Sequence, residues 1–153
     1  MSLAIRLARA EDAPALAAAL RAEDHAEFAA LGDPAELIAG GIKNSAWAYV
    51  AEDEGGPVAV WGLSRATLLG GEGHAWCATT DRVALHRRRF AVASRAWVAA
   101  MLAECDRLSG WCDARYAVSL RWLRWLGAEI GPPVMTAGGV PFRRFEWRPE
   151  HGR

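Results

Sequence analysis

The pattern of apolar residues changes near the middle of this chain, and that change is the strongest constraint on its fold. Residues 46–51, 57–66 and 74–80 are strand-like segments, separated by the acidic turn 52–56 and by a turn at Gly70-Gly71. From Phe90 onward, apolar residues recur at spacings of three, four or seven, which is typical of a helix. The chain is therefore predicted to form an antiparallel meander followed directly by its longest helix.

Shorter elements are predicted before the meander. Residues 5–7 alternate in polarity as a half-buried strand does. Asp12 is placed to cap a first helix, and residues 23–31 either continue that helix or form a second short one. Asp33-Pro34-Ala35-Glu36 starts a further helix, because it combines a capping carboxylate, a proline in the first turn and a glutamate that can reach back. Gly40-Gly41 is expected to end that helix.

The remaining elements follow the long helix. Residues 108–114 are predicted to be a strand, and residues 119–126 a short helix closed by Gly127 in a left-handed conformation. A final hairpin turns at Gly138-Gly139. The predicted order is strand, two helices, three strands, helix, strand, helix and two strands.

The composition limits the class of protein. At 153 residues with 52% apolar residues, the chain suits a single domain over residues 1–153 with one sizeable core. Eighteen basic and eighteen acidic residues cancel, which argues against a general attraction to nucleic acid or anionic membranes. The three cysteines argue against a disulfide framework and for a reducing compartment. Without a membrane-spanning or signal-like segment, a cytoplasmic location is expected.

The segment Ser119-Leu120-Arg121-Trp122-Leu123-Arg124-Trp125-Leu126-Gly127 resembles the second motif of the Gcn5-related N-acetyltransferase (GNAT) family, a short helix that ends in leucine and glycine. The order of elements is similar to that family from end to end. The resemblance implies a mixed α/β (α+β) GNAT fold: a mostly antiparallel sheet of six or seven strands, flanked by about four helices. In that fold the strands over 74–80 and 108–114 splay apart.

A narrower resemblance concerns a phage branch of the same superfamily. Trp76, the pair Arg89-Phe90, the "Ser-x-x-Trp-Leu-x-x-Leu-Gly" run and the acidic segment 24–27 are similar to phage acetyltransferase-like proteins and to the internal virion protein A family. This resemblance implies a virion location and phage virion proteins as partners. A homodimer is the other assembly that we consider.

The GNAT resemblance also implies a binding site for acetyl-coenzyme A as co-substrate. The cofactor would lie between the splayed strands, with its diphosphate on backbone amides at the start of the long helix, where unpaired N–H groups and the positive end of the dipole favour an anion. The family loop reads Gln/Arg-x-x-Gly-x-Gly/Ala, and the nearest match here has alanine at the first glycine position. The implied cofactor-binding residues are Trp76, Ala78, Thr79, Arg87, Arg88, Arg89, Phe90, Ala91, Val92 and Ala93.

The run His86-Arg87-Arg88-Arg89 supports that site independently of the resemblance. It places at least three positive charges at a helix N-terminus, where the helix dipole disfavours cations, and a bound polyanion would relieve the conflict. The alternative is that these are solvated surface arginines, paired for example with Asp81 or Glu72.

Acetyl transfer to an amine needs a base for the ammonium proton and an acid for the leaving thiolate. The candidate bases are Glu72, His74 and Glu27, and each has a plain structural alternative as an exposed or packed side chain. The resemblance places Leu123 where many members have a tyrosine acid, so Tyr116 is the remaining candidate acid, unless it only packs under the short helix. No His-x-x-x-His pair or Cys-x-x-Cys motif is present, and no metal is expected.

Two functions remain open on this basis. The first is an acyl-coenzyme A dependent N-acetyltransferase that acts on a small amine or a protein amino group. The second is a catalytically degenerate structural or interaction protein with the same fold, of phage or prophage origin. The missing glycine and tyrosine favour the second, and the arginine cluster favours the first.

Overall fold

The computed structural model of the chain describes residues 2–65 and 71–148. These residues form two compact units, the first built from residues 2–64 and 76–91 and the second from residues 65, 71–75 and 92–148. Each unit thus combines separate stretches of the chain, and the prediction of a single domain over the whole length stays a prediction. Within the described residues, seven strands are hydrogen-bonded in the order β1-β2-β3-β4-β5-β7-β6.

The first unit contains three strands that pair antiparallel. β1 (Ala4–Leu7) pairs antiparallel with β2 (Ser45–Asp53), and β2 pairs antiparallel with β3 (Gly56–Arg65). The middle of β3, residues 58–63, is continuously buried. The predicted hairpin is therefore confirmed, while Ala66 and Gly70, which were expected to end a strand and form a turn, lie outside the described residues.

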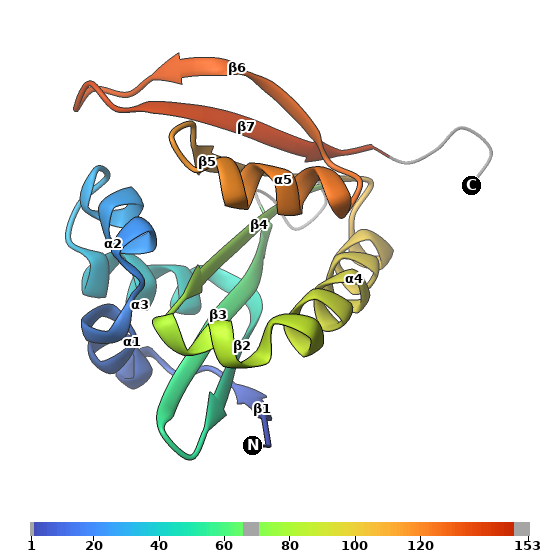
Figure 1. Ribbon diagram of the computed structural model, residues 1–153. Coiled ribbons are helices and arrows are strands. Elements are labelled where there is room, and N and C mark those ends of the chain that lie inside the picture. Colours follow the sequence, from blue (N-terminus) through green and yellow to red (C-terminus); the bar gives the residue numbers. More distant parts are fainter. Residues whose placement is uncertain (1, 66–70, 149–153) are drawn as a thin grey trace. The chain divides into compact units, whose positions relative to one another are not determined.

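Three helices pack together in this unit, as the blue and cyan ribbons of Figure 1 show. They are α1 (Ala13–Ala19), α2 (Ala22–Ala29) and α3 (Pro34–Asn44), and the short 3-10 helix η1 (Ala10–Asp12) precedes them. The core of the unit joins these helices to the sheet through Leu16, Leu20, Ile38, Val50, Val60 and Ala78. The second early helix is thus separate from the first, which makes five α-helices in the described residues where about four were predicted.

The start of α3 is as predicted, but its end is not. The Asp33 carboxylate accepts a hydrogen bond from the Glu36 backbone N–H at 3.0 Å, with Pro34 in the first turn. The helix continues through Gly40-Gly41 to Asn44. Packing explains the difference, because the Trp76 ring lies 3.2 Å from the position that a Gly41 Cβ would occupy, so a residue without a side chain is needed there.

β4 (Glu72–Thr79) leads into the 3-10 helix η2 (Asp81–His86) and then into α4 (Arg87–Glu104), the longest helix. The predicted long helix is confirmed, although it begins at Arg87 rather than at Phe90. β4 pairs in parallel with β5 (Arg107–Asp113), and the paired residues are 72–74 with 107–109. The remaining residues of β4 lie beyond the last of these pairs.

The second unit ends in the predicted hairpin. α5 (Ala117–Trp125) is followed by Gly127, whose φ of 96° is left-handed, as expected for a helix-closing glycine. β6 (Glu129–Met135) and β7 (Pro141–Trp147) form the hairpin seen in Figure 1, and residues 142–147 of β7 also pair antiparallel with residues 108–113 of β5. The strand predicted over residues 108–114 is therefore confirmed as β5.

Candidate functional site

The three arginines of the predicted anion site form the first turn of α4. Arg87, Arg88 and Arg89 are all exposed, and the first turn of α4 contains no acidic residue. Phe90 follows and is only 8% exposed. The structure therefore places three arginines at the N-terminal end of an 18-residue helix, where the helix dipole favours an anion.

The residues matched to the diphosphate loop are all helical. The segment from Arg88 to Ala93 lies entirely within α4, because alanines at 91 and 93 favour a helix where glycines would favour a loop. The loop position between β4 and α4 is taken instead by η2, whose Thr80 cap accepts a hydrogen bond from the Arg82 backbone N–H. The segment directly before the arginines is therefore a 3-10 helix rather than a glycine-rich turn.

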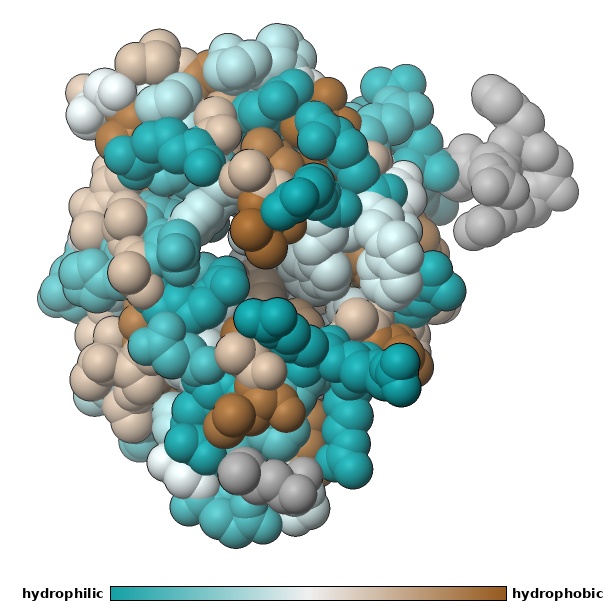
Figure 2. All heavy atoms as spheres, in the orientation of Figure 1, coloured by the Kyte–Doolittle hydropathy of each residue, from teal (hydrophilic) through white to brown (hydrophobic). Residues whose placement is uncertain are grey.

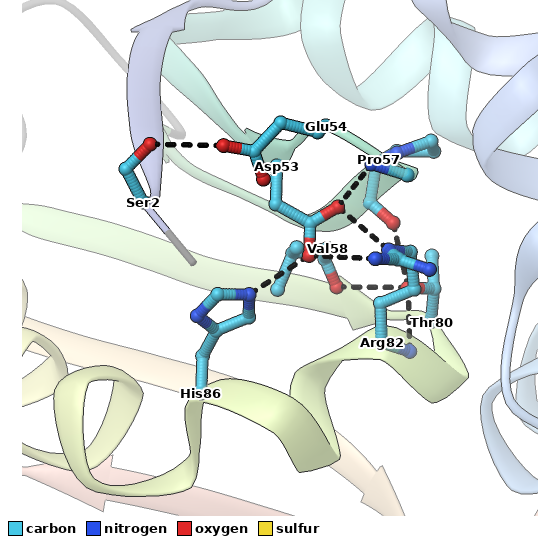
Figure 3. Close-up of polar contacts among 9 residues, drawn as sticks. Ser2, Asp53, Glu54, Pro57, Val58, Thr80, Arg82 and His86 are labelled. Atoms are coloured by element: carbon cyan, nitrogen blue, oxygen red, sulfur yellow. Dashed lines mark hydrogen bonds and ion pairs between the residues drawn. The ribbon is translucent and has the colours of Figure 1, made fainter.

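A buried carboxylate holds η2 in place (Figure 3). Asp53, at the end of β2, accepts hydrogen bonds from Arg82 Nε at 2.7 Å and from Arg82 Nη2 at 3.0 Å. It also accepts from His86 Nε2 at 2.9 Å and from the Gly55 backbone N–H at 2.8 Å. The Asp53 side chain has an exposed fraction of 0% and that of His86 3%, so this contact is internal.

The charge state of this cluster follows from its contacts. Hydrogen bonds from Arg82, then from His86, hold the pKa of Asp53 well below its usual range, so the carboxylate is ionised. An ionised carboxylate only accepts, so His86 Nε2 carries the proton in this contact. His86, which the sequence grouped with the arginines, therefore points inward while the arginines are exposed. Sequence reasoning missed Asp53 and Arg82, because 29 residues separate them and no local pattern links them.

The end of β4 is held by the first turn of α2 and by the two residues that precede this helix. Asp24, which is 9% exposed, accepts hydrogen bonds from the Thr79 backbone N–H at 2.5 Å and from Thr79 Oγ1 at 2.9 Å. The Arg21 backbone N–H donates to the Thr79 carbonyl at 3.1 Å, and Leu20 forms a β-bridge with Thr80. The polar groups of Thr79, one of the predicted cofactor residues, thus each have a protein partner.

Two other predicted cofactor residues of β4 lie within the first unit. Ala78 is fully buried in the core. Trp76 donates its indole N–H to Ser45 Oγ at 2.8 Å, and its ring fills the space left by Gly41 and Gly62. These contacts within the protein are enough to explain a tryptophan at position 76, with no need for a ligand contact.

The candidate bases are divided between the two units. Glu27 is a half-buried residue of α2 in the first unit. Glu72 and His74 lie two residues apart on β4 in the second unit, so they share one face of the strand. Glu72 forms a 3.4 Å ion pair with Arg107, while partial desolvation, followed by the nearby Arg144 cation, lowers the pKa of His74. His74 is an exposed residue of β4, and the lowered pKa favours its neutral imidazole, the form that can accept a proton.

Tyr116 caps the start of α5 in the second unit. Its backbone N–H donates to the Asp113 carbonyl at 3.0 Å, and Asp113 itself forms a 2.6 Å ion pair with Arg115. The Tyr116 hydroxyl is buried, and no residue in the described ranges 2–65 and 71–148 forms a hydrogen bond with it. A buried hydroxyl without a partner costs free energy, so this one requires an explanation.

The wider surface offers few alternatives. In the view of Figure 2, hydrophilic and hydrophobic residues are interspersed. Among the described residues, no group of three or more His, Cys, Asp or Glu side chains could hold a metal ion. None of the helices in the described part of the chain is long and apolar enough to cross a membrane.

Comparison with known proteins separates sequence from structure. The sequence matches no protein-family model and no curated protein. The structure, in contrast, is similar to a GNAT-family acetyltransferase from Bacillus anthracis, with a TM-score of 0.67 at 11% identity, covering 97% of this chain and 95% of that one.

Two further similar structures were solved with a ligand. The protein yncA from Salmonella typhimurium, solved with its cofactor acetyl-CoA, has a TM-score of 0.64 at 12% identity, covering 100% of this chain and 98% of that one. The aminoglycoside acetyltransferase AAC(6')-Ib, in complex with coenzyme A, has a TM-score of 0.63 at 18% identity, with 94% of each chain covered. With its mostly antiparallel seven-stranded sheet and the parallel pair β4–β5, this chain has the fold of the GNAT-family acetyltransferases.

Proposed function

We propose that this protein is an acyl-coenzyme A dependent N-acetyltransferase that acts on a small amine or a protein amino group. The fold supports this proposal, since the similar structures include acetyltransferases, and two of them were solved with acetyl-CoA or coenzyme A. Fold alone does not assign an activity, so the proposal depends on the residues of this chain.

The arginine cluster is the observation that carries the proposal. Three exposed arginines, residues 87–89, stand at the positive end of α4, where the helix dipole makes added cations unfavourable. A diphosphate would offset that cost, because guanidinium groups and phosphates form charge-assisted hydrogen bonds. Coenzyme A carries such a group, and the substrate proposed here therefore matches the charge of the site.

The acid–base roles follow from the second unit. In the transfer, the acceptor nitrogen attacks the thioester carbonyl, the C–S bond breaks, the nitrogen loses a proton and the thiolate gains one. We assign the base to His74, because its lowered pKa favours the neutral imidazole, whereas Glu72 is paired with Arg107. We assign the acid to Tyr116, because a substrate thiolate would supply the hydrogen-bond partner that its buried hydroxyl lacks.

Nothing in the fold or the comparisons favours the alternative of a phage structural protein. The similar structures described above are acetyltransferases or carry the acetyl-CoA cofactor. We therefore do not propose the virion role, although the sequence motifs pointed to that branch.

A thermal-shift titration with acetyl-CoA tests the proposal. A ligand that binds only the folded state raises Tm. At a concentration 100 times the Kd, it adds about 2.7 kcal/mol to the free energy of unfolding. The triple variant R87A/R88A/R89A is expected to lose most of that shift. The matched control is R121A/R124A/R148A, which removes three exposed arginines on α5 and just after β7 and should keep the shift. An unchanged shift in the first variant would contradict the arginine assignment.

A further inference from the structure

The Asp53 cluster reaches both ends of η2. Arg82 is the second residue of this 3-10 helix and His86 is the last, and both donate to the same carboxylate from the β2–β3 hairpin. Thr80, which caps η2, donates its hydroxyl to the Pro57 carbonyl of the same hairpin at 2.7 Å. The close-up in Figure 3 shows these contacts converging on η2 from one side.

η2 depends on this support. It has six residues, whereas 3-10 helices longer than three or four residues are uncommon because their hydrogen bonds are poorly aligned. The contacts of Asp53 are strong in comparison: two parallel bonds from Arg82 and one from His86, all to an ionised and fully buried carboxylate. The clamp, by which we mean Asp53 with Arg82 and His86, therefore decides where η2 lies.

A glycine next to Asp53 fits the same purpose. A Cβ on Gly55 would overlap the Arg82 guanidinium group, so the guanidinium lies flat against the turn. The Gly55 backbone N–H adds a further hydrogen bond to Asp53. The β2–β3 turn and the clamp therefore contact each other directly, and these contacts restrict the side chain of Arg82.

The clamp ends where the arginine cluster begins. His86 is followed directly by Arg87, and η2 passes into α4 without an intervening loop. We propose that Asp53, acting through Arg82 and His86, is a positioning residue that fixes the first turn of α4 so that Arg87–Arg89 meet the diphosphate of the acyl donor. This inference rests on the proposed function, and it adds a group that does not touch the substrate.

Calorimetric titration with two ligands tests the positioning role. The variant Asp53→Asn places an amide N–H donor opposite the N–H groups of Arg82 and His86. We expect the Kd for coenzyme A to rise about tenfold, because the first turn of α4 would then have to be ordered when the ligand binds. The Kd for pantetheine, which has no diphosphate, should not change. A purely structural role of Asp53 would weaken both ligands alike, and that result would overturn the inference.

A double-mutant cycle links the clamp to the arginines. In the R87A/R88A/R89A background, Asp53→Asn should cause no further loss of coenzyme A affinity, whereas additive losses would overturn the inference. The matched control is Asp12→Asn, which removes a carboxylate bound to two nitrogens of Arg6 at 2.8 and 2.9 Å and should leave both affinities unchanged. If Asp53→Asn does not fold, Arg82→Lys decides the question, because it keeps the charge and loses the two-point contact.

The outcomes also separate this inference from the proposed function. If the wild-type protein binds coenzyme A and the clamp variants bind it equally well, only the positioning role is wrong. If the wild-type protein does not bind coenzyme A, the proposed function fails and the positioning role fails with it.

Discussion

At the scale of single residues, the surroundings of two side chains carry the proposed acid–base chemistry. The Tyr116 hydroxyl has no hydrogen-bond partner in residues 2–65 and 71–148, and the pKa of His74 is lowered by desolvation and by Arg144. Sequence reasoning selected both as candidates from a family resemblance and from position in a strand. It had no means of finding the missing partner or the shifted pKa, since both depend on neighbours distant in the sequence.

Replacing Tyr116 with phenylalanine should separate catalysis from stability. We expect kcat for acetyl transfer to fall about 100-fold, within the range for losing a general acid, with little change in KM. The Tm should stay level or rise slightly, because the variant removes a buried hydroxyl that has no partner. A lower Tm with unchanged kcat would mean that Tyr116 only packs under α5.

The pH dependence of kcat/KM tests His74. A base must be neutral to accept a proton, and the pKa of His74 lies below its usual value, so activity should be constant above pH 7. It should fall on acidification only below about pH 6.5, the ordinary histidine pKa. In His74→Gln this acidic limb should disappear along with most of the activity, and a limb that persists would point to Glu72 or Glu27 instead.

At the scale of elements, local signals predicted existence and order better than boundaries. The cap at Asp33-Pro34 and the closing glycine at Gly127 were confirmed because such signals act within one turn. The glycines at 40–41 misled the prediction. α3 continues through both of them, and Gly41 leaves room for the Trp76 ring from another element. The start of α4 was placed three residues late, because arginines carry no apolar periodicity.

The variant Gly110→Ala, which adds one methyl group to β5, should test how closely β4 and β7 approach this strand. A Cβ at Gly110 would overlap the Phe145 ring of β7 and lie 2.6 Å from the Ala75 carbonyl oxygen of β4, an atom that cannot move aside cheaply. We therefore expect Gly110→Ala to destabilise the protein by about 1–3 kcal/mol in chemical denaturation, as overpacking does.

The control for that variant is Gly40→Ala in α3. A Cβ at Gly40 would have no neighbour within 4 Å, so the change should stabilise the protein by up to about 1 kcal/mol through helix propensity. Equal effects at both positions would contradict the close approach at Gly110.

At the scale of the whole molecule, charge balance shapes how a polyanion could bind. The net charge is zero, so the proposed anion site depends on the local field of Arg87–Arg89 rather than on a positive charge of the whole protein. These arginines are exposed and screened by salt, so coenzyme A affinity should fall as KCl rises from 20 to 200 mM, roughly the range in which the Debye length shortens most. Fluorescence or calorimetric titration would show this, and R87A/R88A/R89A should lose most of the salt dependence.

The sequence by itself determined the order of elements, the long helix and its cationic first turn, because each depends on interactions between residues close together in the chain. Only the tertiary structure decided that His86 turns inward to Asp53 and that Thr79 is held by Asp24. It also decided that the Tyr116 hydroxyl is buried with no hydrogen-bond partner in the part of the chain that the structure describes. Burial and hydrogen-bond partners are properties of residues brought together from distant positions. The periodicity and spacing of residues in the sequence do not show which distant residues come into contact.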